Sequence, residues 1–316
     1  MKNARRRIDS HQHAFWHYRD DAGLVQDMDN YEIEYSWLLT WETHPTEHVT
    51  GTGYNQCLNP TRVRADGSLE GIMLEDLLLA RRNYPDRFVM GFCPHPLTGN
   101  APDRLRAAAG MYDVKVCGEW KFRIPFDDPR CIELYRTAGE LGMPVVLHLD
   151  VPYLASNDGS SKYQPLWYGG TVDNLERALI ACPDTIFIGH APGFWRELSG
   201  DADTCPYTSP STPIKEGGRL QRLFDKYENL WADLSAGSAC NALKRDPDYA
   251  KNFLETYSSR LLFARDYYGS GLVNFLDSLD LSDEATQRIA WQNAERLVSP
   301  PSCDERAKKQ AAIIQF

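Results

Sequence analysis

Short apolar runs rich in β-branched residues recur about every 30 to 40 residues along the chain, and helical patterns of apolar positions lie between them. This alternation predicts successive strand–helix units, which build a parallel sheet covered by helices. The predicted strands are residues 6–11, 35–40, 87–92, 114–118, 143–149, 185–189, 230–234 and 260–264.

Helical stretches are predicted at residues 69–83, 128–142, 272–279 and 283–297. The first ends before Pro85, which cannot continue a helix, and the second ends at Gly142, a residue that favours helix C-termini. Strands alternating with helices over the whole chain favour an α/β fold of the (β/α)8 TIM-barrel type, with long βα loops at its C-terminal face. The alternative is an open doubly wound sheet, but no strand is followed by a Gly-rich phosphate loop.

Neither a composition shift nor a flexible linker interrupts this array, so we expect one barrel domain over residues 1–298 and a C-terminal tail over 299–316. The long loops after the second, fifth and sixth strands are rich in Gly, Pro, Thr and Ser, as in residues 200–213. Loops in that position usually carry the active site of a barrel.

The amino-acid composition argues against several classes of function. With 34 Lys and Arg against 44 Asp and Glu, the net charge is −10, which disfavours binding to nucleic acid or to anionic membranes. No apolar run approaches the ~18 residues of a membrane span, and no signal sequence is expected. The eight cysteines are scattered without a CxxC pair, so we expect reduced, mostly buried thiols in a cytoplasmic enzyme that acts on a small molecule.

Candidate metal ligands follow the predicted strands at their C-terminal ends. His11 and His13 end the first strand, and because they are two residues apart, both imidazoles point to the same side of it. His148 ends the fifth strand, His190 ends the sixth, and Asp266 follows the eighth. Imidazole and carboxylate groups gathered at one barrel opening suit a divalent cation such as zinc or manganese.

Four motifs resemble the amidohydrolase superfamily, and more narrowly its amidohydrolase-related (amidohydrolase 2) branch of metal-dependent hydrolases. They are IDSHQH at residues 8–13, VLHLD at 146–150, FIGHAPGFW at 187–195 and LFARDY at 262–267. The resemblance extends from residue 6 to about residue 298 and implies a distorted TIM barrel with a metal at its mouth.

The resemblance also implies roles for individual residues. His11, His13 and His148 match metal ligands, whereas His190 matches a histidine that often contacts substrate or water instead of metal. Asp266 matches an aspartate that ligates or lies beside the metal and accepts a proton. One departure is Arg265, where the family usually has a small residue. A cation beside Asp266 would lower the pKa of that carboxylate and weaken it as a base, unless Arg265 points away.

Other residues could complete the site. Glu119 and Lys121 lie on the same side of an extended segment, and family members place a ligating or bridging glutamate or modified lysine at this strand. We interpret Glu119 as a candidate ligand and Lys121 as a candidate contact for a substrate anion, the alternative being a buried Lys–Glu pair. His95 and Trp195 are candidate substrate contacts, with a backbone-bonded loop histidine and ordinary packing as their alternatives.

Several further aromatic and imidazole side chains follow strand ends. Tryptophans in these positions favour the binding of an aromatic or cyclic substrate, and the alternative is that they only pack in the barrel and its loops. We expect His44 and His48 to lie in a solvated loop rather than to hold a second metal, because Pro45 argues against a helix there. We expect His17 to pack or to face solvent. The tryptophans concerned are Trp16, Trp41, Trp120, Trp167 and Trp195.

These residues predict a metal-dependent hydrolase that uses an activated water on an amide, ester or lactone carbonyl. Asp266 would accept the water proton, and His190 would donate a hydrogen bond to the carbonyl oxygen. The first alternative is a metal-dependent decarboxylase of an aromatic carboxylate, because the same ligands serve both reactions. The second is a metal-stabilised barrel that only binds a ligand. Barrels of this kind commonly self-associate, which leaves a homo-oligomer open.

Overall fold

The structure, a computed structural model, describes residues 6–47 and 58–301. Eight strands form one sheet in the order β1-β2-β5-β6-β7-β10-β11-β12, and every neighbouring pair is parallel. The strands are β1 (Arg7–Gln12), β2 (Ile33–Leu38), β5 (Phe88–Gly91), β6 (Val114–Trp120), β7 (Val145–His148), β10 (Phe187–His190), β11 (Leu230–Asp233) and β12 (Leu261–Leu262).

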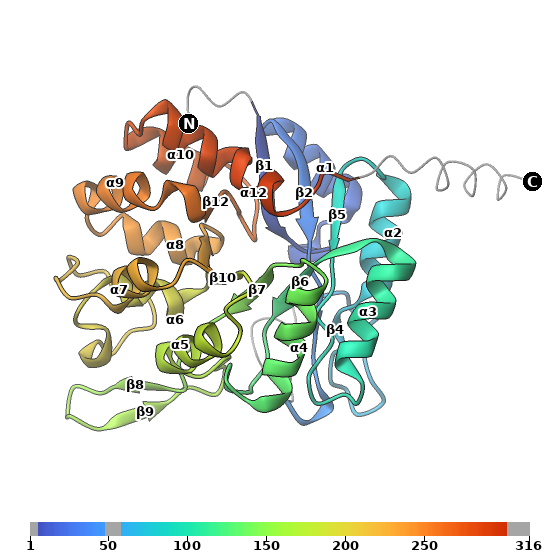
Figure 1. The fold of residues 1–316 in the computed structure, drawn as a ribbon, viewed down its shortest axis with the longest axis horizontal. Helices are drawn as coiled ribbons and strands as arrows, with labels where there is room; N and C mark the ends of the chain where they lie inside the picture. Colours follow the sequence, from blue (N-terminus) through green and yellow to red (C-terminus); the bar gives the residue numbers. More distant parts are fainter. Residues whose placement is uncertain (1–5, 48–57, 302–316) are drawn as a thin grey trace, which may run out of the picture.

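Hydrogen bonds between the first and last strands bring the two edges of the sheet together. Ser10 N donates to Phe263 O at 3.0 Å, and Asp266 N donates to His11 O at 2.9 Å. Helices surround the strands, as Figure 1 shows. The fold is therefore the expected (β/α)8 barrel.

The helices lie between successive strands or at the barrel ends. They are α1 (Asp21–Asn30), α2 (Leu74–Asn83), α3 (Ala101–Tyr112), α4 (Pro129–Glu140), α5 (Val172–Ala181), α6 (Pro192–Trp195), α7 (Arg219–Lys226), α8 (Ala236–Leu243), α9 (Pro247–Thr256), α10 (Gly271–Ser278), α11 (Asp283–Gln287) and α12 (Asn293–Leu297). A π-helical segment, Arg288–Gln292, joins α11 to α12, and Phe263 N donates to Ile289 O within it at 2.8 Å.

Two separate apolar cores match the alternation of the strands. The barrel interior holds one apolar side chain from most strands, such as Ile8, Val116, Val146 and Ile188. The larger core lies between the barrel and its helices, where the alternate residues pack, for example Leu147. This arrangement follows from the period of two along a strand, which sends successive side chains to opposite faces.

Several observed boundaries differ from the predicted ones by one or two residues, and the largest difference is at the first predicted helix. The helix expected from residue 69 begins at Leu74, because Gly71–Ile72 (β4) pairs antiparallel with Trp41–Glu42 (β3). The second strand lies at Ile33–Leu38, two residues earlier than predicted. A hairpin of β8 (Tyr153–Ala155) and β9 (Ser161–Tyr163) extends from the loop after β7, at the lower left of Figure 1.

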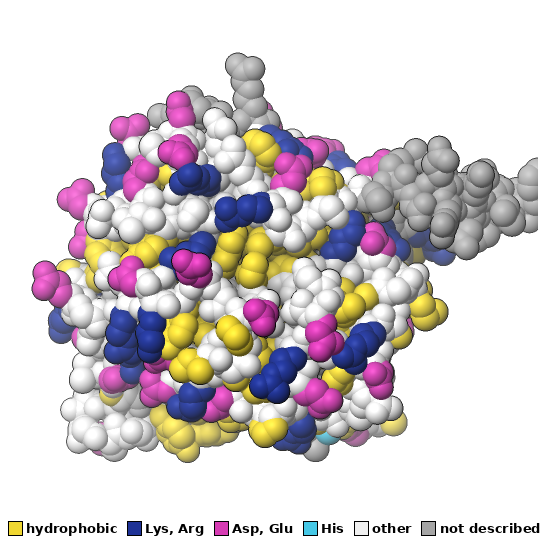
Figure 2. Space-filling model, viewed as in Figure 1, with side chains coloured by type: hydrophobic (Ala, Val, Ile, Leu, Met, Phe, Trp, Pro, Cys, Tyr) yellow, Lys and Arg dark blue, Asp and Glu magenta, His cyan; other side chains and the backbone are white. Residues whose placement is uncertain are grey.

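Surface and terminal features complete the description. Acidic and basic side chains are interspersed over the face shown in Figure 2. Among the described residues, every helix is too short or too polar to span a bilayer. Six cysteines in this part of the chain are buried and free, as predicted. The proposed tail and His48 lie largely or wholly outside the described ranges, so the domain boundary stays a prediction.

Candidate metal centre

Three parallel strands send polar side chains into the mouth of the barrel. Val146, Ile188 and Trp231 face the barrel interior from β7, β10 and β11. His148, His190 and Asp233 come two residues later and end the same strands. The period of two therefore places these three side chains on the inner side, just above the apolar core.

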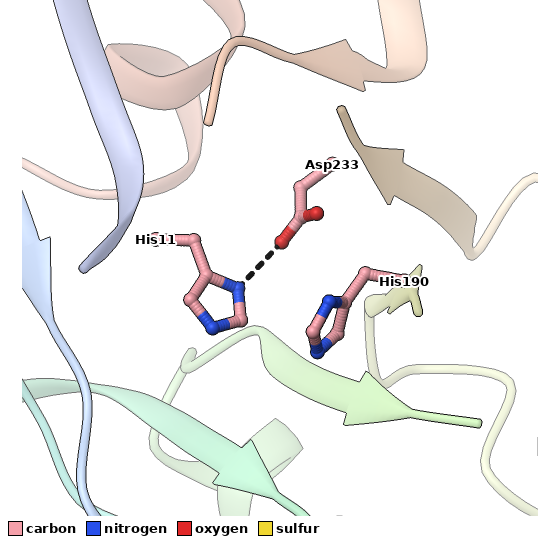
Figure 3. Close-up of side chains that lie close together, drawn as sticks. All are labelled: His11, His190 and Asp233. Atoms are coloured by element: carbon pink, nitrogen blue, oxygen red, sulfur yellow. Dashed lines mark hydrogen bonds and ion pairs between the residues drawn. The ribbon is translucent and has the colours of Figure 1, made fainter. Parts of the chain in front are cut away.

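The two histidines of the HxH motif are held by hydrogen bonds through Nδ1. His11 Nδ1 lies 2.8 Å from Asp233 Oδ2, a contact drawn as a dashed line in Figure 3. His13 Nδ1 lies 2.8 Å from Leu39 O. Both rings are buried. A hydrogen bond at Nδ1 fixes the ring and leaves Nε2 as the ligand atom, which is the usual arrangement for metal-binding histidine.

Glu119 lies at the centre of the cluster. Its Oε1 is 2.7 Å from His148 Nδ1 and 2.7 Å from His190 Nε2. Its Oε2 is 3.5 Å from His13 Nε2, on the side of the HxH motif. One carboxylate thus lies among the histidines that follow or end strands β1, β7 and β10. The role of Glu119 as a metal ligand stays a prediction.

Asp266 approaches the cluster from the loop after β12, the last strand of the barrel. Its Oδ1 lies 3.4 Å from His13 Nε2. Its backbone adopts the left-handed conformation, with φ 48°, which is uncommon outside glycine and marks a backbone held by its surroundings. Those surroundings include the bond from Asp266 N to His11 O and one from Trp16 Nε1 to Asp266 O at 2.8 Å.

Three buried atoms of the site have no hydrogen-bond partner in the part of the chain that the structure describes: His11 Nε2, Glu119 Oε2 and Asp266 Oδ1. Buried polar atoms are nearly always bonded, because leaving one unsatisfied costs about 1–3 kcal/mol. All three are atoms that bind cations. The donor set of His11, His13, Glu119 and Asp266 therefore fits a divalent metal.

A second possible ligand set shares Glu119. Its carboxylate, His148 and His190 offer ligand atoms within 4.8 Å of one another, as do His11, His190 and Asp233. Because Glu119 Oε1 faces one set of histidines and Oε2 the other, the geometry suits either one ion or a bridged pair.

Charge interactions shift the pKa values of the cluster strongly. Burial would raise the pKa of Glu119, but Lys121 and His148 outweigh burial and hold it well below its ordinary value. Burial likewise opposes protonation of His11, yet Asp233, Asp266 and Glu119 raise its pKa to about 9. For His190 burial prevails, and its pKa lies below the ordinary value. Around His11 the carboxylates Asp233, Asp266 and Glu119 thus create a negative potential that a cation would neutralise.

Lys121 is buried beside the cluster, directly after β6. Its Nζ lies 4.2 Å from the centre of the Trp41 ring and 5.6 Å from that of Tyr168. Its charge lowers the pKa of Glu119 and opposes the rise in the pKa of His148 that Glu119 and Asp150 cause. An ammonium group at this position suits contact with an anionic part of a substrate.

His95 and Trp195 lie in well-packed surroundings. His95 Nε2 is 3.1 Å from Glu47 Oε1, and His95 Nδ1 accepts a hydrogen bond from Leu97 N at 3.1 Å. Trp195 is fully buried, with its ring 5.4 Å from that of Phe194. Their substrate contacts stay predictions.

Arg265 points away from Asp266. Its Nε donates to Asp9 Oδ2 at 2.8 Å, and its Nη1 donates to Asp27 Oδ2 at 2.7 Å. Of the two alternatives, the one in which Arg265 points away from Asp266 is therefore the observed one.

Sequence reasoning missed Asp233, Ser235 and Asp150. Asp233 orients His11, Ser235 Oγ lies 3.1 Å from His190 Nδ1, and Asp150 Oδ2 lies 2.9 Å from His148 Nε2. Asp233 carried a usable signal, because it ends the seventh strand as His148 ends the fifth. Ser235 and Asp150 carried none, since short polar residues are common in βα loops.

Comparison with known proteins identifies the family. The family model described as amidohydrolase matches residues 8–299. The chain belongs to the amidohydrolase family. Amidohydrolases of this family are enzymes that use a divalent metal, and the described residues hold candidate ligand sets for one. No curated protein matches the chain.

Solved amidohydrolase structures share the fold. A probable 2-pyrone-4,6-dicarboxylic acid hydrolase from Acinetobacter baumannii with bound citric acid is 13% identical, with TM-score 0.56 over 92% of this chain and 98% of that one. A 2,6-dihydroxybenzoate decarboxylase from Rhizobium is 16% identical, with TM-score 0.51 over 92% and 97%. A dihydroxybenzoic acid decarboxylase from Polaromonas with bound manganese is 17% identical, with TM-score 0.52 over 92% and 96%. At these identities the likeness shows the fold alone.

Proposed function

We propose that the protein is a metal-dependent hydrolase that acts on an amide, ester or lactone carbonyl of a small, cyclic or aromatic substrate. The observation that carries the proposal is the set of unpartnered buried atoms on His11, Glu119 and Asp266, gathered around His13. A site built only for stability would pair these atoms with one another or with the backbone.

The cation would be held by His11, His13, Glu119 and Asp266. If Glu119 bridges two ions, His148 would be a further ligand. Zinc is our first proposal because it favours imidazole and carboxylate ligands, and manganese is the second. When bound, such an ion supplies Lewis acidity, which lowers the pKa of water from 15.7 towards ~7 and polarises a carbonyl.

Asp266 is the proposed general base. Its carboxylate lies beside the proposed cation site, with Oδ1 3.4 Å from His13 Nε2, so it is placed to take a proton from the attacking water and pass it to the leaving group. His190 is proposed to donate a hydrogen bond to the carbonyl oxygen as negative charge develops, from the Nε2 that now faces Glu119.

Lys121 is the proposed contact for an anionic group on the substrate. It presents a buried ammonium beside Glu119 and His148, between the rings of Trp41 and Tyr168. The aromatic walls fit a flat or apolar substrate body next to that charge. A cytoplasmic location and self-association stay predictions.

Decarboxylation of an aromatic carboxylate is the competing reaction, because decarboxylases are among the solved structures that share the fold. The deciding experiment incubates the metal-loaded protein with esters, lactones and aromatic carboxylates in 18O-labelled water. Oxygen-18 in a carboxylate product supports the proposal, whereas release of carbon dioxide without label in the aromatic product supports decarboxylation. No turnover by a fully metal-loaded protein on any compound would favour a barrel that only binds.

A further inference from the structure

The loop that carries Asp266 packs against the loop that follows the HxH motif. Tyr268 Oη donates to the backbone carbonyl of Trp16 at 2.8 Å. The rings of His17 and Tyr267 meet edge to face, with their centres 4.7 Å apart. Because one loop follows β1 and the other follows β12, these contacts join the two ends of the barrel sheet at its catalytic face.

Four residues of these two loops adopt the left-handed backbone conformation although none of them is glycine. The angle φ is 52° at Phe15, 50° at His17, 63° at Tyr18 and 48° at Asp266. This conformation is unfavourable for a residue with a side chain, so it persists where surrounding contacts hold it, often at functional sites. At Asp266 it also decides where the carboxylate points.

Hydrogen bonds at both backbone polar groups hold Asp266 in this conformation. Asp266 N donates to His11 O at 2.9 Å, and Asp266 O accepts from Trp16 Nε1 at 2.8 Å. In this arrangement the Oδ1 atom of Asp266 lies 3.4 Å from His13 Nε2. Trp16 is 4% exposed, and its ring also meets the His13 ring edge to face, with 5.3 Å between the centres. One buried side chain thus contacts both a candidate ligand and the proposed base.

We propose that Trp16 is a positioning residue, whose indole N–H keeps the Asp266 carboxylate directed at the metal centre. Without this donor the Asp266 carbonyl would lose its partner, and the backbone would be free to leave the left-handed conformation. A change of φ at Asp266 would turn its carboxylate away from His13. This role rests on the proposed function, in which Asp266 is the base, whereas the contact that holds the loop can be tested without turnover.

Amide hydrogen exchange followed by mass spectrometry tests that contact on protein saturated with Co(II). Trp16→Phe keeps an aromatic ring at this position and removes the N–H donor. Exchange at residues 265–269 should become at least ~10-fold faster than in wild type. Tyr268→Phe, which removes the hydroxyl bound to the Trp16 carbonyl, should give a smaller increase. Trp167→Phe is the matched control, because it removes an indole N–H that binds Tyr163 Oη at 3.3 Å, and it should leave exchange at 265–269 unchanged.

Two further measurements distinguish a positioning role from a merely structural one. On the best substrate from the labelled-water experiment, Trp16→Phe saturated with metal should lower kcat at least ~10-fold and leave KM nearly unchanged. A displaced base slows the chemical step without weakening the binding of substrate. The visible absorption bands of the Co(II)-substituted protein depend on the groups around the ion, and they should differ between Trp16→Phe and wild type.

Faster exchange at 265–269 together with a lower kcat or changed Co(II) bands supports the proposal. Exchange in Trp16→Phe equal to that in wild type overturns it, and so does faster exchange with kcat and the Co(II) bands both unchanged. If Trp16→Phe does not fold, the same comparison on Tyr268→Phe decides. Wild-type protein that turns over none of the compounds would contradict the proposed hydrolase, and the exchange and Co(II) measurements would then decide the role of Trp16.

Discussion

Two aspartates lie on either side of the seam where the barrel closes, and the chain surrounds them differently. Asp9 on β1 accepts hydrogen bonds at both oxygens, from Arg265 N at 2.9 Å, Arg265 Nε at 2.8 Å and Gln12 Nε2 at 3.0 Å. Asp266 after β12 has a buried Oδ1 that no described residue hydrogen-bonds. The first carboxylate is satisfied by the protein itself, whereas the second is held in place and left available.

This contrast distinguishes a buried carboxylate that supports the fold from one that is kept for binding or catalysis. A buried carboxylate with a complete set of partners contributes to folding, because removing a partner exposes its desolvation cost. A buried carboxylate atom kept without partners costs stability and is retained when something else binds there. The following predictions test whether the division holds.

The largest expected effect is on stability, at Arg265. Arg265→Met leaves Asp9 buried without its cation and leaves Asp27 with Arg19 alone, and breaking such a buried pair costs about 3–5 kcal/mol of unfolding free energy. Urea unfolding followed by circular dichroism measures the loss. Arg265→Lys keeps the charge and should lose less. Equal stability of Arg265→Met and wild type would show that this network does not hold the seam.

Asp266→Asn should show the opposite behaviour. The variant keeps its shape and loses no hydrogen bond at Oδ1, so we expect the unfolding free energy to change little. Turnover should fall at least ~10²-fold, because the amide cannot accept a proton. Steady-state kinetics on the best substrate from the labelled-water experiment measure kcat. Kinetics close to those of wild type would remove Asp266 as the base.

Asp233→Asn tests the residue that orients His11. The amide keeps a hydrogen bond to Nδ1 but removes the charge, and changing such outer partners typically weakens metal binding 10- to 100-fold. Competition with a chromophoric chelator measures the affinity for zinc. Asp150→Asn, on His148, is the matched comparison. An unchanged affinity in Asp233→Asn would mean that the charge of Asp233 does not support metal binding through His11.

The smallest expected effect is a pH dependence of the unfolding free energy, which we attribute to Glu47. Burial would raise its pKa, but the contact with His95 Nε2 at 3.1 Å and the hydrogen bond from Arg123 N hold it below the ordinary value of 4.5. A lowered folded-state pKa means that this stabilisation is complete above pH 4.5 and is lost as the pH falls through the folded-state pKa. Unfolding free energies measured between pH 6 and pH 3 should fall more steeply in wild type than in Glu47→Gln. Parallel curves would contradict this assignment.

The order of the strands and the positions of most candidate ligands at one end of the barrel were predictable from the sequence. A period of two along each strand and the common direction of parallel strands bring His11, His148 and His190 to one end, wherever the exact boundaries lie. The antiparallel pair β3–β4 was not predictable, because two-residue strands leave no periodic pattern.

Partner choice inside the barrel also could not be predicted. Whether Arg265 faces Asp266 or Asp9 depends on how β12 meets β1, two strands separated by the whole chain. For the same reason the bonds from Glu119 to His148 and His190 required the closed barrel. The sequence shows which chemical groups reach the mouth, and tertiary structure decides which of them pair.

Metal content tests the central claim most directly. Purified protein saturated with zinc or manganese, then freed of excess ion, is analysed by inductively coupled plasma mass spectrometry beside His11→Ala, His13→Ala and the control His95→Ala. We predict one or two equivalents in wild type and in His95→Ala, whose ring lies against Glu47, and a small fraction of that in the other two variants. Wild-type protein without stoichiometric metal, or full occupancy in both His11→Ala and His13→Ala, would contradict the account.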